Sequence, residues 1–501
     1  MANFLFGNIL HPALAAFLAS CGTVYAADGK FGAYAPSPQY TPPTDPLVLK
    51  NLTRFQGLKF GVLLDWQACT QWGIDSWPLC PERWDWNKRV DYINGKPEGS
   101  EQDNLKYKAS YEALQKTFHP TKYDPEKWAE LLQQSGVKYA LIMAKHHDGF
   151  CLWDTAQTDY KTTSTNCPFH QLPGADTVKA VGDALRKRGI RVGVYFSKPD
   201  WHTPTYWSPE FPMFPPDYAQ KMVGRNANYN PRQHPELWKK FKEFTWAQVE
   251  ELMKNYGEID SLWLDGGQVN PAINAQDIDM KGLAAMARKY QPGLLVVDRC
   301  VRGDNEDFLT PEGEHAMPGS HQPYPWEACM HITRHWNYFP NDKVKSTGEL
   351  VHYLCRATAR GGNYLLGIGP DALGEFDPHV VTNMRGVGDW LKLNGEAIYN
   401  TTPIAPYEQG NCLFTAKQDG TRYAIVLASD EKMQLPESVT LPKSILERGS
   451  RISLLPFNEP LSSEAATNGQ CIVRVPPAAR SQQPSGIAWV IKFAPNAGKG
   501  K

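Results

Sequence analysis

The chain has 501 residues, of which 42% are hydrophobic and 21% charged, values ordinary for a globular protein. Its formal net charge of -1 excludes a strongly basic surface, so we expect neither nucleic acid nor an anionic membrane surface as a partner. The length predicts two or three domains, or one large barrel with a smaller module.

The first 27 residues have the pattern of a signal peptide. Residues 4–18 are largely apolar, and small residues near Ala26 suit cleavage. Within this segment LASC (18–21) resembles a bacterial lipobox, in which Cys21 would become the lipid-modified residue. We therefore expect an exported protein that is periplasmic, extracellular, or held at the outer membrane by a lipid anchor. Residues 28–48, rich in Pro, Tyr and Ser, are predicted to be a linker.

Residues 49–400 alternate between short apolar runs and amphipathic stretches. Helical patterns such as residues 124–136 begin at an N-cap Asp and stop at a Gly. This alternation predicts parallel strands covered by helices. A closed (β/α)8 barrel of the TIM type fits the length better than one open sheet, which periodicity alone leaves as the alternative. The clearest predicted strands are FGVLL (60–64), YALIM (139–143), RVGVYF (191–196), SLWL (261–264), LLVV (294–297) and YLLGI (364–368).

The pattern changes over residues 401–495, where short strand-like runs are separated by Pro, Gly, Asn and Ser. This pattern predicts a small C-terminal antiparallel β-sandwich, followed by a tail at 496–501. The predicted strands are RYAIVLA (422–428), SVTLP (438–442), CIVRV (471–475) and IAWVIKF (487–493).

Polar residues follow several of the predicted barrel strands. In a parallel barrel these positions meet at one end, where the active site lies. Sixteen Trp and twenty-two Tyr supply flat rings with a polar edge, which suit the faces of sugars. Acids, histidines and an arginine among aromatic plates therefore indicate a carbohydrate site. The residues concerned are Asp65, His146, His147, Asp265 and Arg299.

A glycosidase needs two carboxyl groups at such a site. Asp265 is the better candidate nucleophile, because it closes a strand and the glycines at 266–267 leave room for a sugar ring. Position alone leaves open that Asp265 caps the strand end or pairs with an arginine. The adjacent His-His-Asp at 146–148 raises the alternative of a metal site. Neighbouring side chains on an extended chain diverge, however, which favours hydrogen bonding over metal binding.

Six stretches in chain order carry a family resemblance. They are KYALIMAKHHDGFCLWDTAQTDY (138–160), GVYFSKPDWH (193–202), SLWLDGG (261–267), DFLTPE (307–312), WEACM (326–330) and ARGGNYLLGIGPDALGEF (359–376). They resemble glycoside hydrolase family 29, the α-L-fucosidases. The resemblance implies a (β/α) barrel with a C-terminal β-sandwich that releases α-L-fucose from fucosylated oligosaccharides or glycoconjugates. It further implies a retaining double displacement without a cofactor or a metal.

The resemblance also implies roles for individual residues. Asp265 matches the family nucleophile. Glu312 and Glu327 each match the acid/base proposed for a different branch of the family, and we slightly favour Glu312. The predicted hydroxyl-binding and polar contact residues are Trp77, His146, His147 and Arg299, and the predicted wall around the C6 methyl group is Tyr195, Trp263 and Trp336, with Leu63 in the place of a family Phe.

Two positions depart from the family pattern. The first strand ordinarily ends in His-Trp-Gly but here ends in Asp65-Trp66-Gln67, and Ser76 stands where a Glu usually precedes Trp77. An ionised carboxylate only accepts hydrogen bonds, whereas a neutral histidine can also donate one. We therefore expect Asp65 to bind a sugar hydroxyl and to alter the sugar preference. The alternatives are an α-L-galactosidase on the same scaffold and a catalytically inactive sugar-binding protein.

Overall fold

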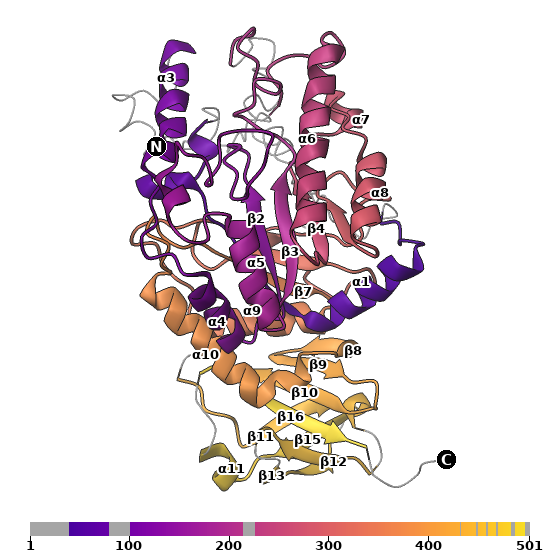
Figure 1. Ribbon diagram of the computed structural model, residues 1–501. Coiled ribbons are helices and arrows are strands. Elements are labelled where there is room, and N and C mark those ends of the chain that lie inside the picture. Colours follow the sequence, from indigo (N-terminus) through magenta and orange to yellow (C-terminus); the bar gives the residue numbers. More distant parts are fainter. Residues whose placement is uncertain are drawn as a thin grey trace, which may run out of the picture.

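A computed structural model describes residues 40–79, 101–213, 226–430, 432–446, 449–456, 459–466, 469–481 and 486–495. The predicted signal peptide, the lipobox at Cys21, most of the predicted linker and the C-terminal tail lie outside the described residues. The described residues contain helices and two separate sheet regions (Figure 1).

The larger part of the protein is built around one parallel sheet of seven strands, in the order β5-β4-β3-β2-β1-β7-β6 (Figure 1). Because every neighbouring pair is parallel, the carboxyl ends of all the strands lie along one edge. Six of these strands coincide with the predicted apolar runs, and β6 is the additional one. The strands are β1 (Phe60–Leu64), β2 (Tyr139–Lys145), β3 (Arg191–Ser197), β4 (Ser261–Asp265), β5 (Leu295–Asp298), β6 (Glu327–His331) and β7 (Asn363–Ile368).

Alternating side chains give this curled sheet two apolar faces. Leu63, Tyr195 and Trp263 belong to an inner cluster, whereas the intervening residues of the same strands join the larger core beneath the outer helices. Helix α1 (Pro46–Leu58) packs Phe55 and its neighbours against the inner cluster, next to Tyr139 at the start of β2. The amino end of the sheet is therefore filled mainly by apolar side chains, and most of the polar ones lie at the carboxyl end.

Helices cover the outer face of the parallel sheet (Figure 1). Helix α4 begins at the predicted cap Asp124, which accepts backbone N–H bonds, and the structure adds Asp176 as a cap of the same kind at the start of α5. The helices of this part, besides α1, are α3 (Glu101–Glu112), α4 (Pro125–Gln134), α5 (Thr177–Lys187), α6 (Pro235–Asn255), α7 (Pro271–Asn274), α8 (Met280–Tyr290), α9 (Thr347–Ala359) and α10 (Pro378–Asn394).

The described sheet has seven strands rather than the eight of the predicted barrel. The chain between β5 and β6 is irregular, but it contacts both edge strands through isolated bridges. Glu306 bridges Val297 of β5, and Glu312 bridges Cys329 of β6. The segment that carries Glu312 therefore lies between the two edges of the sheet.

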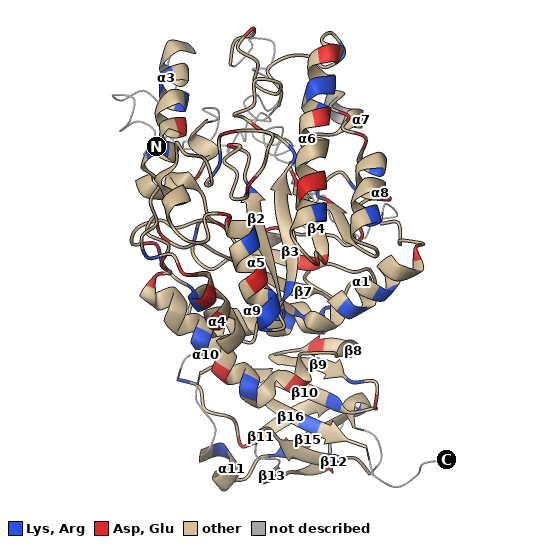
Figure 2. Ribbon diagram, viewed as in Figure 1, with Lys and Arg blue, Asp and Glu red and all other residues tan. Residues whose placement is uncertain are grey.

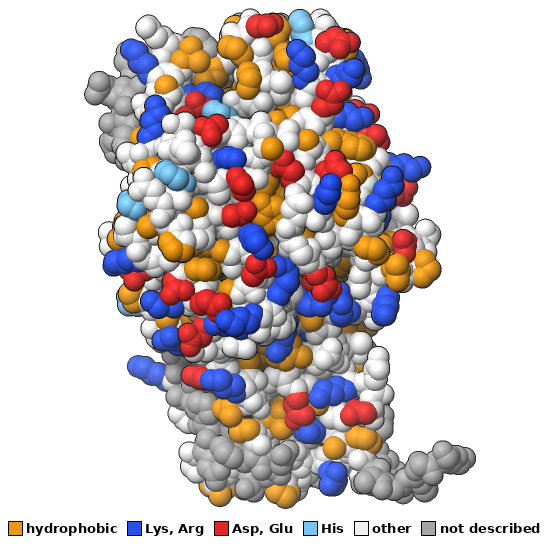
Figure 3. Space-filling model, in the orientation of Figure 1, with side chains coloured by type: hydrophobic (Ala, Val, Ile, Leu, Met, Phe, Trp, Pro, Cys, Tyr) orange, Lys and Arg blue, Asp and Glu red, His pale blue; other side chains and the backbone are white. Residues whose placement is uncertain are grey.

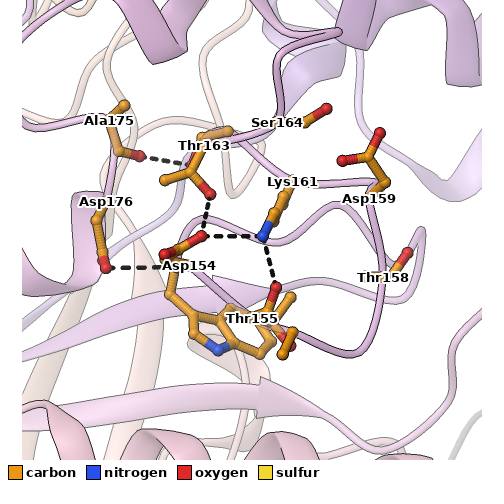
Figure 4. Close-up of polar contacts among 12 residues, drawn as sticks. Asp154, Thr155, Thr158, Asp159, Lys161, Thr163, Ser164, Ala175 and Asp176 are labelled. Atoms are coloured by element: carbon orange, nitrogen blue, oxygen red, sulfur yellow. Dashed lines mark hydrogen bonds and ion pairs between the residues drawn. The ribbon is translucent and has the colours of Figure 1, made fainter.

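Polar contacts fix the connection that follows β2 (Figure 4). The Lys161 ammonium donates to Asp154 Oδ1 at 2.9 Å, and the Thr163 hydroxyl donates to the same oxygen at 2.7 Å. The Asp154 N–H in turn donates to Asp176 Oδ2 at 3.4 Å, which joins this connection to the start of α5. These contacts hold together the connection between β2 and α5.

Two antiparallel sheets follow α10. Trp489 and Phe414 of the larger sheet share one apolar core with Leu441 and Val473 of the smaller sheet, beside a short helix α11 (Pro477–Ser481). The six-stranded sheet has the order β13-β12-β16-β10-β9-β8 and the three-stranded sheet β11-β15-β14. Their strands are β8 (Thr402–Gln409), β9 (Cys412–Ala416), β10 (Arg422–Leu427), β11 (Ser438–Pro442), β12 (Arg451–Leu454), β13 (Glu459–Pro460), β14 (Ser462–Ala465), β15 (Gln470–Arg474) and β16 (Ala488–Ala494).

Charged residues of both signs are interspersed along the outer helices, as on α6 (Figure 2). The face in Figure 3 likewise mixes acidic, basic and apolar side chains. Such mixing agrees with the net charge of -1 and gives no electrostatic reason to expect a polyanionic partner on this face. Among the described helices, none combines the length and the apolar character needed to cross a bilayer.

Candidate active site

The predicted polar residues meet at the carboxyl end of the parallel sheet. Asp265 is the last residue of β4, Arg299 directly follows β5, and Asp65 directly follows β1. His146 and His147 directly follow β2. One ring nitrogen of each histidine and one carboxylate oxygen of Asp265 lie within 4.8 Å of one another. The topology thus brings together residues that are more than two hundred positions apart in the chain.

Asp265 is held by donors on both carboxylate oxygens. Oδ2 accepts from the Tyr195 hydroxyl at 2.7 Å, and Oδ1 accepts from Arg299 Nη1 at 2.8 Å and from the Gly266 N–H at 2.8 Å. Burial alone would raise the pKa of Asp265, but the charges of Arg299 and His147 and the bonds from Tyr195 and Arg299 outweigh it and hold the pKa well below the usual range. The surroundings of Asp265 therefore favour its ionised carboxylate form.

Arg299 joins two carboxylates. Its Nη1 bonds Asp265 and its Nη2 bonds Glu312 Oε2, so one planar guanidinium spans both acids. The guanidinium carbon lies 4.9 Å from the centre of the Trp263 ring, which supports it from one side. The other oxygen of Glu312 accepts from the Trp336 indole N–H at 3.1 Å. Glu312 remains 35% exposed, which leaves it accessible from the mouth of the site.

The hydrogen bonds of two serines fix the tautomer that each histidine has when neutral. Ser197 donates to the Pro199 carbonyl at 2.8 Å, so its oxygen must accept the 2.5 Å bond from His147 Nδ1. Ser76 donates to Asp75 Oδ1 at 3.2 Å and lies 2.6 Å from His146 Nδ1, which gives the same arrangement. A proton on Nδ1 leaves Nε2 as an acceptor in the neutral ring. His147 Nε2 lies 3.8 Å from Asp265 Oδ2.

Aromatic rings surround these polar groups. Tyr195 stacks on His146 with ring centres 5.9 Å apart and packs against Trp263 at 5.3 Å. Trp77 meets the His147 ring edge-on at 5.1 Å, and Leu63 lies in the same inner cluster as Tyr195. Trp336 lies so close to the backbone of β7 that a Cβ at residue 367 would come within 2.6 Å of its ring, which explains the glycine at that position. The predicted aromatic wall is thus assembled around the site.

Glu327 lies elsewhere. It is the first residue of β6, at the amino end of the sheet, where it accepts a hydrogen bond from Tyr139 at the start of β2. It has no solvent exposure, and burial raises its pKa to about 8, with smaller opposing contributions from Tyr139 and Trp263. Glu327 and Asp265 are therefore found at opposite ends of their strands, whereas Glu312 shares a guanidinium with Asp265.

Asp65 occupies a corner with other acids. It is 2% exposed, and Oδ1 accepts from Gln67 Nε2 at 2.9 Å. Burial raises the pKa of Asp65 to about 7; the charge of His146 opposes this rise, and the neighbouring carboxylates of Asp75 and Asp148 add to it. The surroundings of Asp65 therefore favour the protonated form, whereas those of Asp265 favour the ionised form.

His331 is a polar residue of the site that the sequence analysis missed. It ends β6, its Nδ1–H donates to the Thr333 carbonyl at 2.6 Å, and its ring meets Trp336 edge-on at 5.1 Å. Burial lowers its pKa, so it favours the neutral form. The signal for β6 was weak, because the run EACMH has charged or polar residues at both ends.

Comparisons with known proteins show the family of this chain. A family model described as alpha-L-fucosidase matches residues 31–396. The tissue alpha-L-fucosidases of Macaca fascicularis and Bos taurus are 28% and 26% identical to this chain, covering 91% of it and 92% and 91% of their own lengths. The structure of alpha-L-fucosidase isoenzyme 1 from Paenibacillus thiaminolyticus superposes with a TM-score of 0.68 at 26% identity, covering 89% of this chain and 99% of that one. The chain therefore belongs to the alpha-L-fucosidase family, glycoside hydrolase family 29.

Proposed function

We propose that the protein releases α-L-fucose from the ends of fucosylated glycans or glycoconjugates by a retaining double displacement. The observation that carries this proposal is the Arg299 guanidinium, which holds Asp265 and Glu312 beside each other at the carboxyl end of the sheet. Retaining glycosidases use two neighbouring carboxyl groups, one as the nucleophile and one as the acid/base.

In the first step, a carboxylate oxygen of Asp265 attacks the anomeric carbon of the bound fucoside. The bond from that carbon to the leaving oxygen breaks, and Glu312 gives its proton to that oxygen, so the aglycone departs as an alcohol. Attack from the opposite face inverts the configuration and yields a β-linked fucosyl-enzyme. The low pKa of Asp265 suits this role, because it keeps the carboxylate ionised and makes it a good leaving group in the second step.

In the second step, the Glu312 carboxylate takes a proton from water, and the water oxygen attacks the anomeric carbon. The ester bond to Asp265 breaks, the carboxylate returns, and the second inversion restores the α configuration. Arg299 and Tyr195 stay within reach of the Asp265 oxygens in both steps and stabilise the negative charge that returns to them.

The sugar hydroxyls have matching partners at the site. One ring nitrogen of His146 and one of His147 lie within 4.8 Å of an Asp265 oxygen, where each can accept a bond from a sugar hydroxyl when the ring is neutral and donate one when it is protonated. Asp65 adds a third acceptor where the family usually has a histidine. We assign Leu63, Tyr195, Trp263 and Trp336 to the wall around the C6 methyl group. A C6 hydroxyl against this wall would lose its hydrogen bonds with water, which favours fucose over L-galactose.

We also propose that the parallel sheet closes into a barrel, on the basis of the isolated bridges to its two edge strands. The segment from Glu306 to Glu312 lies between β5 and β6, and it would complete the seven strands into a (β/α)8-type barrel. The two antiparallel sheets with their shared core would form a β-sandwich behind it. Export, with either a cleaved leader or a lipid anchor at Cys21, remains our proposal for its location.

A direct assay tests the proposed activity. The full-length protein should hydrolyse an activated aryl α-L-fucoside at least about tenfold better than the matching α-L-galactoside, measured as kcat/KM, because one misplaced hydroxyl costs roughly that much. A preference for the galactoside would assign the alternative activity. Fucose binding without turnover would instead identify a sugar-binding protein. Activity that survives EDTA would support chemistry without a metal.

A further inference from the structure

Two fully buried charged residues lie at strand ends next to Asp265 and Arg299. Lys198 follows the last residue of β3, Asp298 ends β5, and the Lys198 ammonium donates to Asp298 Oδ1. Their side chains are 0% and 3% exposed. Since β4 lies between β3 and β5 in the sheet, this ion pair reaches across the end of the strand that carries Asp265.

Backbone bonds tie the same three strand ends together. The Lys198 N–H donates to the Asp265 carbonyl at 2.9 Å, and the Arg299 N–H donates to the Leu264 carbonyl at 3.1 Å. The Lys198–Asp298 pair thus adds a side-chain contact to the backbone bonds that join the ends of β3, β4 and β5. Asp265 and Arg299 both lie at these strand ends.

The turn that Arg299 opens has an unfavourable backbone. Cys300 and Arg302 have φ values of 65° and 69°, in the left-handed region that L-residues rarely adopt. The turn is closed by the Asp298 N–H, which donates to the Asn305 carbonyl at 2.8 Å. Such conformations persist only where the surroundings hold them, so the turn needs an anchor at Asp298.

Glu306 is a second buried acid near this pair, and the cations that act on it are Arg302 first and Lys198 next. It is 1% exposed, and burial, with the charge of Asp298 next, raises its pKa to about 8. The Lys198 ammonium donates to Asp298, whereas the Arg299 guanidinium contacts Asp265 and Glu312. The anchor and the site therefore use different cations.

We propose that Lys198 and Asp298 are positioning residues that fix the turn after β5, so that Arg299 contacts Asp265 and Glu312 together. This inference rests on the proposed function, because it assigns the pair an effect on turnover. Buried ion pairs are often no more stabilising than apolar residues of the same volume, so stability alone gives little reason for this one. A displacement of about 1 Å in a catalytic constellation, in contrast, can cost roughly a hundredfold in rate.

The chain offers a matched control in the pair Lys145–Asp200. Its ammonium and carboxylate are 2.6 Å apart and 0% and 2% exposed, and Lys145 packs over Phe196 of β3 and Phe244 of α6. This pair has the same chemistry and burial as Lys198–Asp298, but it does not include the residue that precedes Arg299.

A double-mutant cycle in the full-length enzyme tests the proposal. Lys198→Met should lower kcat/KM for an activated aryl α-L-fucoside by roughly a hundredfold. In the Arg299→Ala background the same change should have less than about a twofold further effect, because the residue through which Lys198 acts is gone. Lys145→Met should change kcat/KM by the same factor in both backgrounds. An equal factor for Lys198→Met in both backgrounds would overturn the proposal.

A second variant tests the proposal if Lys198→Met does not fold. Replacing both partners, Lys198→Met with Asp298→Leu, removes the charges without leaving one unpaired and should keep the melting temperature near that of the wild type. Its kcat/KM should still fall as for the single change, and wild-type turnover in this variant would contradict the positioning role. If the wild type releases no fucose, the proposed function fails separately. A crystal structure of the double variant then decides: Arg299 displaced from Asp265 supports the proposal, and Arg299 in place overturns it.

Discussion

Asp265 and Asp65 stand in equivalent places, since each marks the carboxyl end of a buried parallel strand, yet their pKa values move in opposite directions. Burial raises both. Asp265 has the Arg299 guanidinium, His147 and the Tyr195 hydroxyl to offset it, and its pKa falls well below the usual range. At Asp65, His146 and Gln67 lower the pKa, but burial and the carboxylates of Asp75 and Asp148 raise it, and the pKa rises to about 7. Partners, rather than burial, decide which acid can serve as a nucleophile.

The largest expected effect tests the assignment of the nucleophile. Asp265→Gly should lower turnover of an aryl fucoside by at least about 10⁴-fold, because no other carboxylate can form the ester. Azide, small enough to fill the gap, should restore turnover and give the β-fucosyl azide by a single inversion. Near-normal activity of Asp265→Gly without azide would show that another group attacks.

The second prediction separates the two glutamates. Glu312→Ala should lower kcat/KM by roughly 10²- to 10⁴-fold, less for aryl leaving groups that need no proton. Azide should then intercept the fucosyl-enzyme and give the α-fucosyl azide, because two inversions restore the configuration. Glu327→Ala should give no azide product, since Glu327 lies at the other end of the sheet beside Tyr139. Azide rescue of Glu327→Ala alone would reverse the two roles.

The third prediction concerns what Asp65 does instead of attacking. Asp65→His replaces an acceptor by a ring that can donate, so the ratio of kcat/KM for the α-L-fucoside and the α-L-galactoside should change by roughly tenfold. Asp148→Asn is the control, because it alters a buried carboxylate of the same corner that is held by Tyr111. An unchanged ratio in Asp65→His would end the idea that this position sets the sugar preference.

The smallest expected effect is on stability. Between the ordinary pKa of 3.8 and the folded value of about 7, the folded protein binds an extra proton at Asp65, so its stability falls as the pH rises through this window. Asp65→Asn does not titrate, and its melting temperature relative to the wild type should therefore be higher at pH 8 than at pH 5, by a few degrees in order of magnitude.

Asp265 supplies the control for this measurement. Its lowered pKa places its titration below both pH values, so the shift caused by Asp265→Asn should be the same at pH 5 and pH 8. A pH-independent shift for Asp65→Asn as well would mean that Asp65 is ionised throughout, like Asp265.

Much of the fold was predictable because the strands are nearly uniform apolar runs. FGVLL coincides with β1, and the runs at β2, β3, β4, β5 and β7 were found as well. Strand β6 was missed because Glu327 and His331 at its ends break the apolar pattern. The irregular chain between β5 and β6 has no periodicity at all, so the position of Glu312 could come only from the structure.

Sequence position could select residues that the structure brings together at the carboxyl end of the sheet, but it could not give their contacts. Position after a strand was enough to select Asp265, Asp65 and Arg299. That Arg299 joins Asp265 to Glu312 could not be read from sequence, because thirteen positions of irregular chain separate Arg299 from Glu312. The choice between Glu312 and Glu327 likewise depends on which end of the sheet each one reaches.

The most direct test of this account is to trap the fucosyl-enzyme with a 2-fluoro-fucosyl fluoride, digest the protein and locate the label by mass spectrometry. The slow second step of such a substrate should leave one fucosyl group, attached through an ester to Asp265. A label on Asp65, or fucose release without any covalent intermediate, would contradict the central claim that Arg299 makes Asp265 the nucleophile.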